Sequence, residues 1–278
     1  MNLIQIILLA VVQGMAELLP ISSSAHVIVA EKLMGLNPTS PEMTFLLVML
    51  HTGTMVAVLF FFWKRWMKIW HSQSKAELIK VLVIATVVTG VVGVVIKKII
   101  EKVFLGGEGA EIEQIFGNLE LVGAALLVAG LLIIFAGLRA KDKNAGLTQA
   151  NAAAIGAVQG LCLPFRGFSR SGSTISAGMF LGIPRALAED FSFALAVILT
   201  PPVIARELLR LIKNGELSHT LTPELFLPGL AGMVFSFFAG LLALKWLSNW
   251  MEKGRWYWFG AYCVAASMLV FFLYSRGL

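Results

Sequence analysis

The chain has 278 residues, of which 58% are hydrophobic and only 14% charged, with a formal net charge of +6. This composition excludes an ordinary soluble domain, in which about a quarter of the residues carry a charge. Hydrophobic stretches of about 20 residues, long enough to cross a bilayer as a helix, recur along the chain. We therefore expect an all-α polytopic membrane protein, because barrel strands would show short alternating segments instead.

Six stretches are long and apolar enough to be transmembrane helices. They cover roughly residues 43–63, 78–100, 119–138, 186–209, 226–248 and 256–275. Two further apolar stretches, 3–36 and 150–184, are interrupted by Pro, Gly and Ser. We predict that these two form re-entrant helical hairpins, because irregular backbone at membrane depth survives only where it lines a cavity within the protein.

The two broken stretches resemble each other in sequence. "AVVQGMAELLPISSSAH" around Gln13 and "GAVQGLCLPFRGFSRSGST" around Gln159 both run Val-Gln-Gly, a short apolar turn, a Pro and then a serine cluster. Three predicted spans separate the copies, so they would enter the membrane with opposite topology and meet near its midplane. We expect one membrane domain, 1–278, in which an inverted repeat relates about 1–138 to about 150–278.

The distribution of charge predicts an orientation. Lys and Arg are more frequent on one side of the predicted spans, for example at Lys64, Arg65 and Lys68, and that side is expected to be cytoplasmic. Both termini then face outward. Because the basic residues are spread over short loops, anchoring in an anionic bilayer is favoured over nucleic-acid binding. Cys162 and Cys263 lie in apolar sequence without metal-ligand spacing, so we expect buried thiols.

The first polar cluster begins with Gln13 and Glu17, which share one face of the predicted helix. A carboxylate inside the bilayer costs on the order of 2.5–3.5 kcal/mol and is by default a candidate functional group facing a cavity. Together with an amide oxygen it forms half of a site for a hard cation, which water and substrate phosphates would complete around Mg²⁺. The alternative is a Glu that pairs with a buried Arg for structure alone.

The first cluster continues with Pro20, which ends the helix, and with Ser22, Ser23 and Ser24, where the next helix should begin. Serines there can cap the free N–H groups, and a helix N-terminus is a site for anions. His26 follows, and a hydroxyl near an imidazole and a carboxylate has the components of an activated nucleophile. For any single serine, capping or close helix packing is the alternative role.

The second cluster is "FRGFSRSGST", residues 165–174. Gly167 and Gly172 allow close approach of the backbone, and Arg170 supplies a planar donor fork suited to phosphate oxygens. Hydroxyls come from Ser169, Ser171, Ser173 and Thr174. Glycines, hydroxyls and an Arg before a helix predict a phosphate cradle. The structural alternative, in which Arg170 pairs with Glu17, is compatible with catalysis if the pair opens for an anion.

If the two hairpins meet, their side chains suit phosphoryl transfer, in which catalysis is mostly positioning and neutralisation of charge. A site buried in the membrane implies a phosphate carried on a lipid. A transporter is the alternative from another class, because inverted repeats with broken helices also describe carriers. Metal-dependent release of phosphate would separate the two.

Both motifs resemble those of the bacterial undecaprenyl pyrophosphate phosphatases of the bacitracin-resistance type. "QGMAELLPISSSAH" is similar to (E/Q)GxxExLPxSSxxH, and "GFSRSGSTI" to PGxSRSGxTI. "FFFWKRW" and "RALAEDFSFALAVI" also match, so the resemblance covers most of the chain. There are two departures: Gln13 stands where many members have Glu, and Arg166 stands where Pro is usual.

The resemblance implies an enzyme of the bacterial inner membrane that hydrolyses undecaprenyl pyrophosphate to the monophosphate and so recycles the carrier lipid for peptidoglycan synthesis. It implies a divalent cation, Mg²⁺ or Ca²⁺, at Glu17 and Gln13, and a site that faces the periplasm. Whether protomers pair as a homodimer is left open.

The resemblance also assigns roles to single residues. Glu17 would serve the metal or act as general acid or base, Ser23 would be the nucleophile or position the substrate, His26 would be a base or proton donor, and Arg170 would bind the pyrophosphate. The further pyrophosphate ligands would be Ser22, Ser169, Ser171, Gly172 and Thr174. Beyond the resemblance, we expect Ser24 and the departing residue Arg166 to bind the pyrophosphate as well. Attack by Ser23 and direct attack by a water that His26 activates both stay open.

Overall fold

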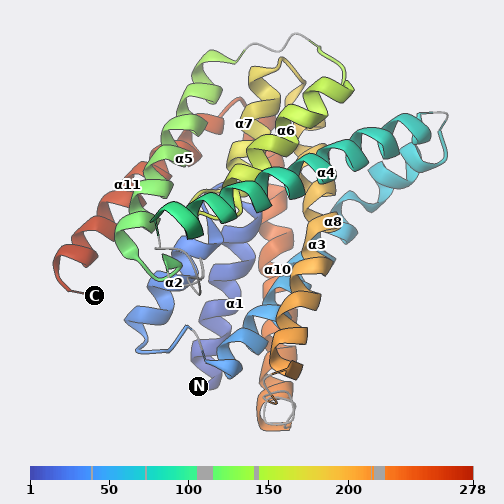
Figure 1. The fold of residues 1–278 in the computed structure, drawn as a ribbon. Coiled ribbons are helices and arrows are strands. Elements are labelled where there is room, and N and C mark those ends of the chain that lie inside the picture. The colour runs from blue at the N-terminus through green and yellow to red at the C-terminus, as the bar shows by residue number, and fades with distance from the viewer. Residues whose placement is uncertain are drawn as a thin grey trace.

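The computed structural model describes residues 1–38, 40–72, 74–104, 115–140, 144–213, 215 and 223–277, and within these ranges it contains helices and no strand. Figure 1 shows long helices that surround two pairs of shorter ones. In the described part of the chain, six helices are long and apolar enough to cross a membrane, as predicted. They are α3 (Pro41–Trp70), α4 (Lys75–Ile99), α5 (Leu119–Arg139), α8 (Arg185–Lys213), α10 (Pro223–Glu252) and α11 (Trp256–Ser275). The chain is a multi-pass membrane protein.

Some of these helices extend beyond the predicted spans. α3 continues to Trp70, through the stretch that contains Lys64 and Arg65, and α4 continues into a short π-helix, η1 (Ile100–Phe104). The prediction from hydropathy stopped α3 near the first charged residue. Lys and Arg are nevertheless good helix formers, so a helix can continue past the end of its apolar stretch.

Each of the two broken stretches forms a pair of short helices. The first pair is α1 (Leu3–Leu18) and α2 (Ser23–Leu33), and the second is α6 (Gln149–Cys162) and α7 (Arg170–Phe180). α1 packs against α2, and α6 packs against α7. The predicted helix breaks after each Val-Gln-Gly are therefore confirmed. The re-entrant course through a bilayer and the inverted repeat stay predictions.

Glycine gives both hairpins close contact with a long helix, α1 with α10 and α6 with α4. A Cβ on Gly14 would lie only 2.6 Å from the carbonyl oxygen of Ser236 on α10, and one on Gly160 would lie 2.8 Å from that of Thr89 on α4. Such separations leave no room for a side chain, and small residues allow helices to approach closely in membranes. The Val-Gln-Gly sequence therefore serves the same packing role in both hairpins.

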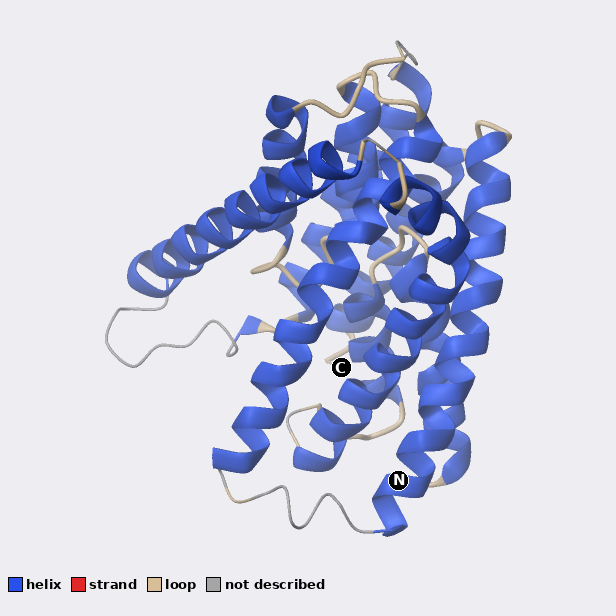
Figure 2. Cartoon of the chain, turned by 90° about the vertical axis from the view of Figure 1, so that its right-hand side faces the viewer, coloured by secondary structure: helices blue, strands red, loops and turns tan. Residues whose placement is uncertain are grey.

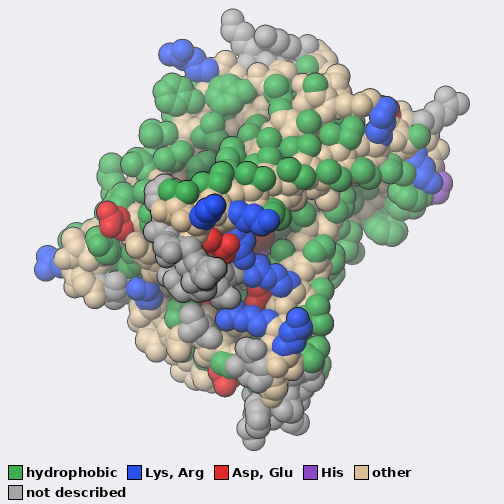
Figure 3. Space-filling model, in the orientation of Figure 1, with side chains coloured by type: hydrophobic (Ala, Val, Ile, Leu, Met, Phe, Trp, Pro, Cys, Tyr) green, Lys and Arg blue, Asp and Glu red, His purple; other side chains and the backbone are tan. Residues whose placement is uncertain are grey.

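The outer surface is apolar, as expected for contact with lipid. Exposed side chains follow one face of α4, including Val83, Val87 and Val91, whereas the largest buried ones include Trp256 and Phe62. Figure 3 shows hydrophobic side chains over most of the visible face, with Lys and Arg gathered in its centre below α4. In the view turned by 90°, shorter helices and loops lie among the long helices (Figure 2). The polar motifs are thus held inside an apolar shell.

Candidate active site

The turns of the two hairpins lie against each other. The backbone N–H of Gly167 donates to Ser24 Oγ at 3.1 Å, across 143 residues of sequence. Ser171 Oγ donates to the Leu19 carbonyl oxygen at 3.5 Å. The structure thus brings the two motifs together at one place.

Serine caps the second helix of each hairpin. Ser22 Oγ accepts from the N–H of Ala25 at the start of α2, and Ser169 Oγ accepts from the N–H of Gly172 at the start of α7. Ser22 has a φ of 69°, in the left-handed region that few residues other than glycine adopt. Strain of this kind is often retained at functional sites. Both N-termini of these helices lie at the junction of the hairpins, where a helix end favours an anion.

Glu17 is the centre of the polar network between the hairpins. Its Oε1 accepts from Arg170 Nη2 at 2.9 Å. Its Oε2 accepts from Ser23 Oγ at 2.5 Å and from Gln13 Nε2 at 3.4 Å. His51 on α3 brings its Nε2 to 4.0 Å from the same oxygen. One carboxylate therefore links both hairpins to a spanning helix.

The guanidinium of Arg170 is only partly satisfied. Its Nη2 pairs with Glu17, and the two side chains are 20% and 16% exposed. Its Nη1 is buried and has no hydrogen-bond partner among the described residues. A buried donor without a partner costs roughly 1–3 kcal/mol. Arg170 therefore has a donor free for a ligand while it stays paired with Glu17.

His26 faces a different neighbour from the one that the sequence suggested. Its Nδ1 lies 2.8 Å from the carbonyl oxygen of Ser22, and its Nε2 lies 2.8 Å from the hydroxyl of Tyr262 on α11. The two rings are stacked, with centroids 5.6 Å apart. Both ring nitrogens are thus occupied, whereas the hydroxyl of Ser23 donates to Glu17.

Several predicted ligands of the pyrophosphate lie deeper in the protein. Ser171 and Thr174 are 3% and 1% exposed. Thr174 Oγ1 donates to the Arg170 carbonyl oxygen at 2.8 Å and shares a hydrogen bond of 2.6 Å with Ser192 Oγ on α8. In this structure the hydroxyls of Ser171 and Thr174 support the packing of α7. Their assignment to the substrate stays a prediction.

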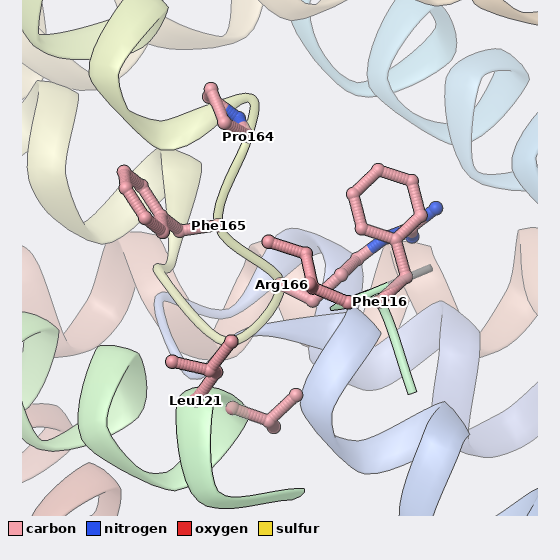
Figure 4. Close-up of a pocket in the computed structure, with 7 residues that line it drawn as sticks. Phe116, Leu121, Pro164, Phe165 and Arg166 are labelled. Atoms are coloured by element: carbon pink, nitrogen blue, oxygen red, sulfur yellow. The ribbon is translucent and has the colours of Figure 1, made fainter. Parts of the chain in front are cut away.

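Arg166 lies at a small apolar pocket beside the second hairpin. Its guanidinium carbon is 4.5 Å from the ring centroid of Phe116, a cation–π contact. Leu121, Pro164 and Phe165 line the same pocket (Figure 4). The role of Arg166 as a second phosphate donor stays a prediction.

The donor atoms around Glu17 fit a cation that takes only some of its ligands from the protein. Among the described residues, no three His, Cys, Asp or Glu side chains lie close enough together to bind a metal ion. A closed structural site is thus not present in that part of the chain. A carboxylate with an amide and a hydroxyl does fit a cation such as Mg²⁺, which keeps several waters and completes its shell with substrate phosphates. The side chain of Gln13 can offer its oxygen if the amide is turned over.

The sequence reasoning missed His51 and Tyr262. His51 carried a usable signal, because it is an ionisable residue within a predicted span, and such residues are functional candidates by default. Tyr262 carried none, since a single aromatic residue in an apolar helix is ordinary. Only the packing of α11 against the site makes it a neighbour of His26.

The fold and the site define a class: a polytopic helical membrane protein with a polar network between two helical hairpins. The family model described as bacitracin resistance protein BacA matches residues 6–269. The chain belongs to this family.

Curated relatives match along nearly the whole chain. Undecaprenyl-diphosphatase 2 of Acinetobacter baylyi is 54% identical over 277 residues, which cover 97% of each protein. The undecaprenyl-diphosphatase of Desulfatibacillum aliphaticivorans is 33% identical and covers 97% of this chain and 99% of its own length. That of Rhodopirellula baltica is 34% identical over 99% of each.

Proposed function

We propose that this protein is an undecaprenyl pyrophosphate phosphatase, which hydrolyses the lipid pyrophosphate to undecaprenyl phosphate and inorganic phosphate. Its activity recycles the carrier lipid for peptidoglycan synthesis. Family membership and the names of the relatives support this function. The single observation that carries it is the geometry at Arg170. Its Nη2 donates to the carboxylate of Glu17, which also accepts from Ser23 Oγ, and its Nη1 has no hydrogen-bond partner among the described residues.

Binding begins at the second hairpin. The pyrophosphate accepts hydrogen bonds from Arg170 and from the free N–H groups at the start of α7, which favour negative charge. The isoprenoid tail stays among the helices. Because Arg170 already holds Glu17, the carboxylate and the phosphate lie on either side of one guanidinium, next to Ser23.

Ser23 is the nucleophile in the step that fits the structure best. Its Oγ attacks the terminal phosphorus, its proton passes to Glu17, and the bond to the bridging oxygen breaks, so undecaprenyl phosphate leaves. Water then hydrolyses the phosphoserine, releases inorganic phosphate and restores the hydroxyl. Glu17 is favoured as the base over His26, because Ser23 Oγ donates directly to Glu17 at 2.5 Å. In the alternative, Glu17 activates a water and Ser23 orients the phosphate.

A divalent cation, Mg²⁺ or Ca²⁺, held by Glu17 and Gln13, would neutralise charge on the phosphate oxygens. For location, we place the protein in the bacterial inner membrane, with both termini and the site facing the periplasm. The excess of Lys and Arg on the opposite side of the spans supports this orientation.

The function is tested by release of inorganic phosphate from undecaprenyl pyrophosphate by the protein purified in detergent, with Mg²⁺, with Ca²⁺ or with a chelator. We expect metal-dependent release that Arg170→Ala and Glu17→Ala each lower by roughly 100-fold or more, because each removes stabilisation of the transition state. Arg139→Ala is the matched control, since Arg139 is an exposed residue at the end of α5.

Failure of the folded wild-type protein to release phosphate would favour the transporter. Inverted repeats with broken helices also occur in carriers, which move a substrate without cleaving it. Uptake of a lipid phosphate into vesicles without hydrolysis would then be the result to look for.

A further inference from the structure

His51 lies beside the carboxylate at the centre of the site, on a helix that the motifs do not include. Its Nδ1 is 2.7 Å from the carbonyl oxygen of Leu47, one turn earlier on α3. Since a carbonyl oxygen only accepts, Nδ1 carries the hydrogen, and the lone pair of the neutral ring is on Nε2. Nε2 is the atom that lies 4.0 Å from Glu17 Oε2.

The spacing of these two atoms suits a shared cation. A direct hydrogen bond between nitrogen and oxygen requires about 2.7–3.2 Å, and 4.0 Å is too long. Two ligand atoms on nearly opposite sides of one metal ion, each about 2.0–2.2 Å from it, are roughly 4 Å apart, so an ion shared by these two atoms would lie between them. The fixed Nδ1–H fits as well, because a histidine that binds a metal usually donates its other N–H to a carbonyl or carboxylate.

The position is accessible to an ion. The side chain of His51 is 33% exposed and that of Glu17 is 16% exposed. Beside Glu17, Gln13 provides only a neutral amide rather than a second carboxylate, which leaves room for a further ligand. An imidazole supplies an uncharged but strong donor in its place.

We propose that His51 Nε2 is a direct ligand of the catalytic cation, together with Glu17 and the phosphates of the substrate. This inference rests on the proposed function for the phosphates, but the nitrogen ligand stands on the geometry of α3 and α1. Mn²⁺ takes the same carboxylate and water ligands as Mg²⁺ and therefore serves as the probe of this site.

The test measures Mn²⁺ binding to the full chain in detergent by electron paramagnetic resonance, with methylenediphosphonate in place of the substrate phosphates. Pulsed measurements on protein labelled with ¹⁵N-histidine report whether a histidine nitrogen is coordinated. We expect a ¹⁵N coupling in the wild type that both His51→Ala and His51→Gln abolish, with Mn²⁺ affinity lowered about 10-fold or more.

His71→Ala is the matched control. His71 directly follows the same helix and its Nδ1 also lies close to the carbonyl oxygen one turn earlier, 2.8 Å from Met67, but it is exposed. It should leave both the coupling and the affinity unchanged. Ser23→Ala should keep the coupling although phosphate release is lost.

Three outcomes overturn the proposal: no Mn²⁺ binding by the wild type, bound Mn²⁺ without a histidine coupling, or a coupling that survives in both His51 variants. Each of these outcomes is measured on protein that is not turning over substrate. If the wild-type protein shows the coupling but releases no phosphate, His51 is still a ligand of the cation, and only the proposed phosphatase activity is refuted.

Discussion

Ser23 and Ser24 are neighbours in sequence but have different partners. Ser23 Oγ donates to Glu17, whereas Ser24 Oγ accepts from the N–H of Gly167 and lies 3.2 Å from Ser22 Oγ. The first serine therefore contacts the central carboxylate, and the second joins the hairpins. Replacing either serine by alanine removes a single hydroxyl oxygen, so the two variants can be compared directly.

We predict that Ser23→Ala lowers phosphate release by roughly 1,000-fold or more, because loss of a nucleophile removes a whole reaction path. The decrease in phosphate release caused by Ser24→Ala should be at least tenfold smaller than that caused by Ser23→Ala. The measurement is phosphate release at saturating metal, together with trapping of a phosphorylated protein from substrate labelled in the terminal phosphate. An active Ser23→Ala protein would exclude the phosphoserine and leave direct attack by water.

Gly167 gives a prediction about stability. Its φ is +98°, and a Cβ there would overlap the carbonyl oxygen of Val122 on α5. We expect Gly167→Ala to destabilise the protein by about 1–3 kcal/mol, through strain in the backbone and through the clash. Thermal unfolding in detergent measures the effect.

The control for Gly167 is Gly35→Ala. Gly35 also has a positive φ, +67°, but nothing lies within 4 Å of a Cβ at that position. It should show only the smaller cost of the left-handed conformation, about 1–2 kcal/mol at most. Equal losses for the two variants would mean that the contact with α5 is unimportant.

Among the helices, the contact of α6 with α4 depends on glycine. A Cβ at Gly160 would lie 2.8 Å from the Thr89 carbonyl oxygen, while Gly90 on α4 has open space around it. We expect Gly160→Ala to lower the unfolding temperature and Gly90→Ala to leave it unchanged or to raise it, since Ala is favoured over Gly in a helix by about 0.5–1 kcal/mol. A Gly160→Ala protein as stable as the wild type would show that the two helices can separate without cost.

The helices and their breaks could be predicted from the sequence because their causes are local. Apolar length specifies α5 and α11, and Pro20 with its serines specifies the end of α1 and the cap of α2. The same holds for the presence of Glu17 and Arg170 in one site, which follows from the rarity of charge in a membrane.

The partners of single side chains could not be predicted, because they depend on packing between distant helices. Nothing near His26 in sequence indicates that its Nε2 meets Tyr262 rather than a serine. Similarly, Thr174 belongs to a motif of hydroxyls, yet Ser192 on α8 occupies it. The sequence named residues that the two hairpins do bring together, and it raised the pairing of Arg170 with Glu17, but it did not specify the other hydrogen bonds among them.

At the scale of the whole molecule, cysteine labelling tests the predicted orientation in the membrane. Cys162 and Cys263 are free and buried, so they leave a low background. Ser72, after α3, and Gly277, after α11, are both exposed. If the C-terminus is periplasmic, a membrane-impermeant maleimide should label Gly277→Cys in intact cells and Ser72→Cys only after permeabilisation. The reverse pattern would place the site on the cytoplasmic side.

The Glu17–Arg170 ion pair bears on how the product departs. A ligand shares the guanidinium with this carboxylate, which already neutralises part of its charge, so the anion with the greater negative charge gains more from binding. A pyrophosphate ester carries more charge than the monophosphate ester that cleavage leaves on the lipid. After each turnover the monophosphate is therefore held less strongly beside the intact ion pair, and the spent lipid is released. The resting pair would thus protect the protein against inhibition by its own product.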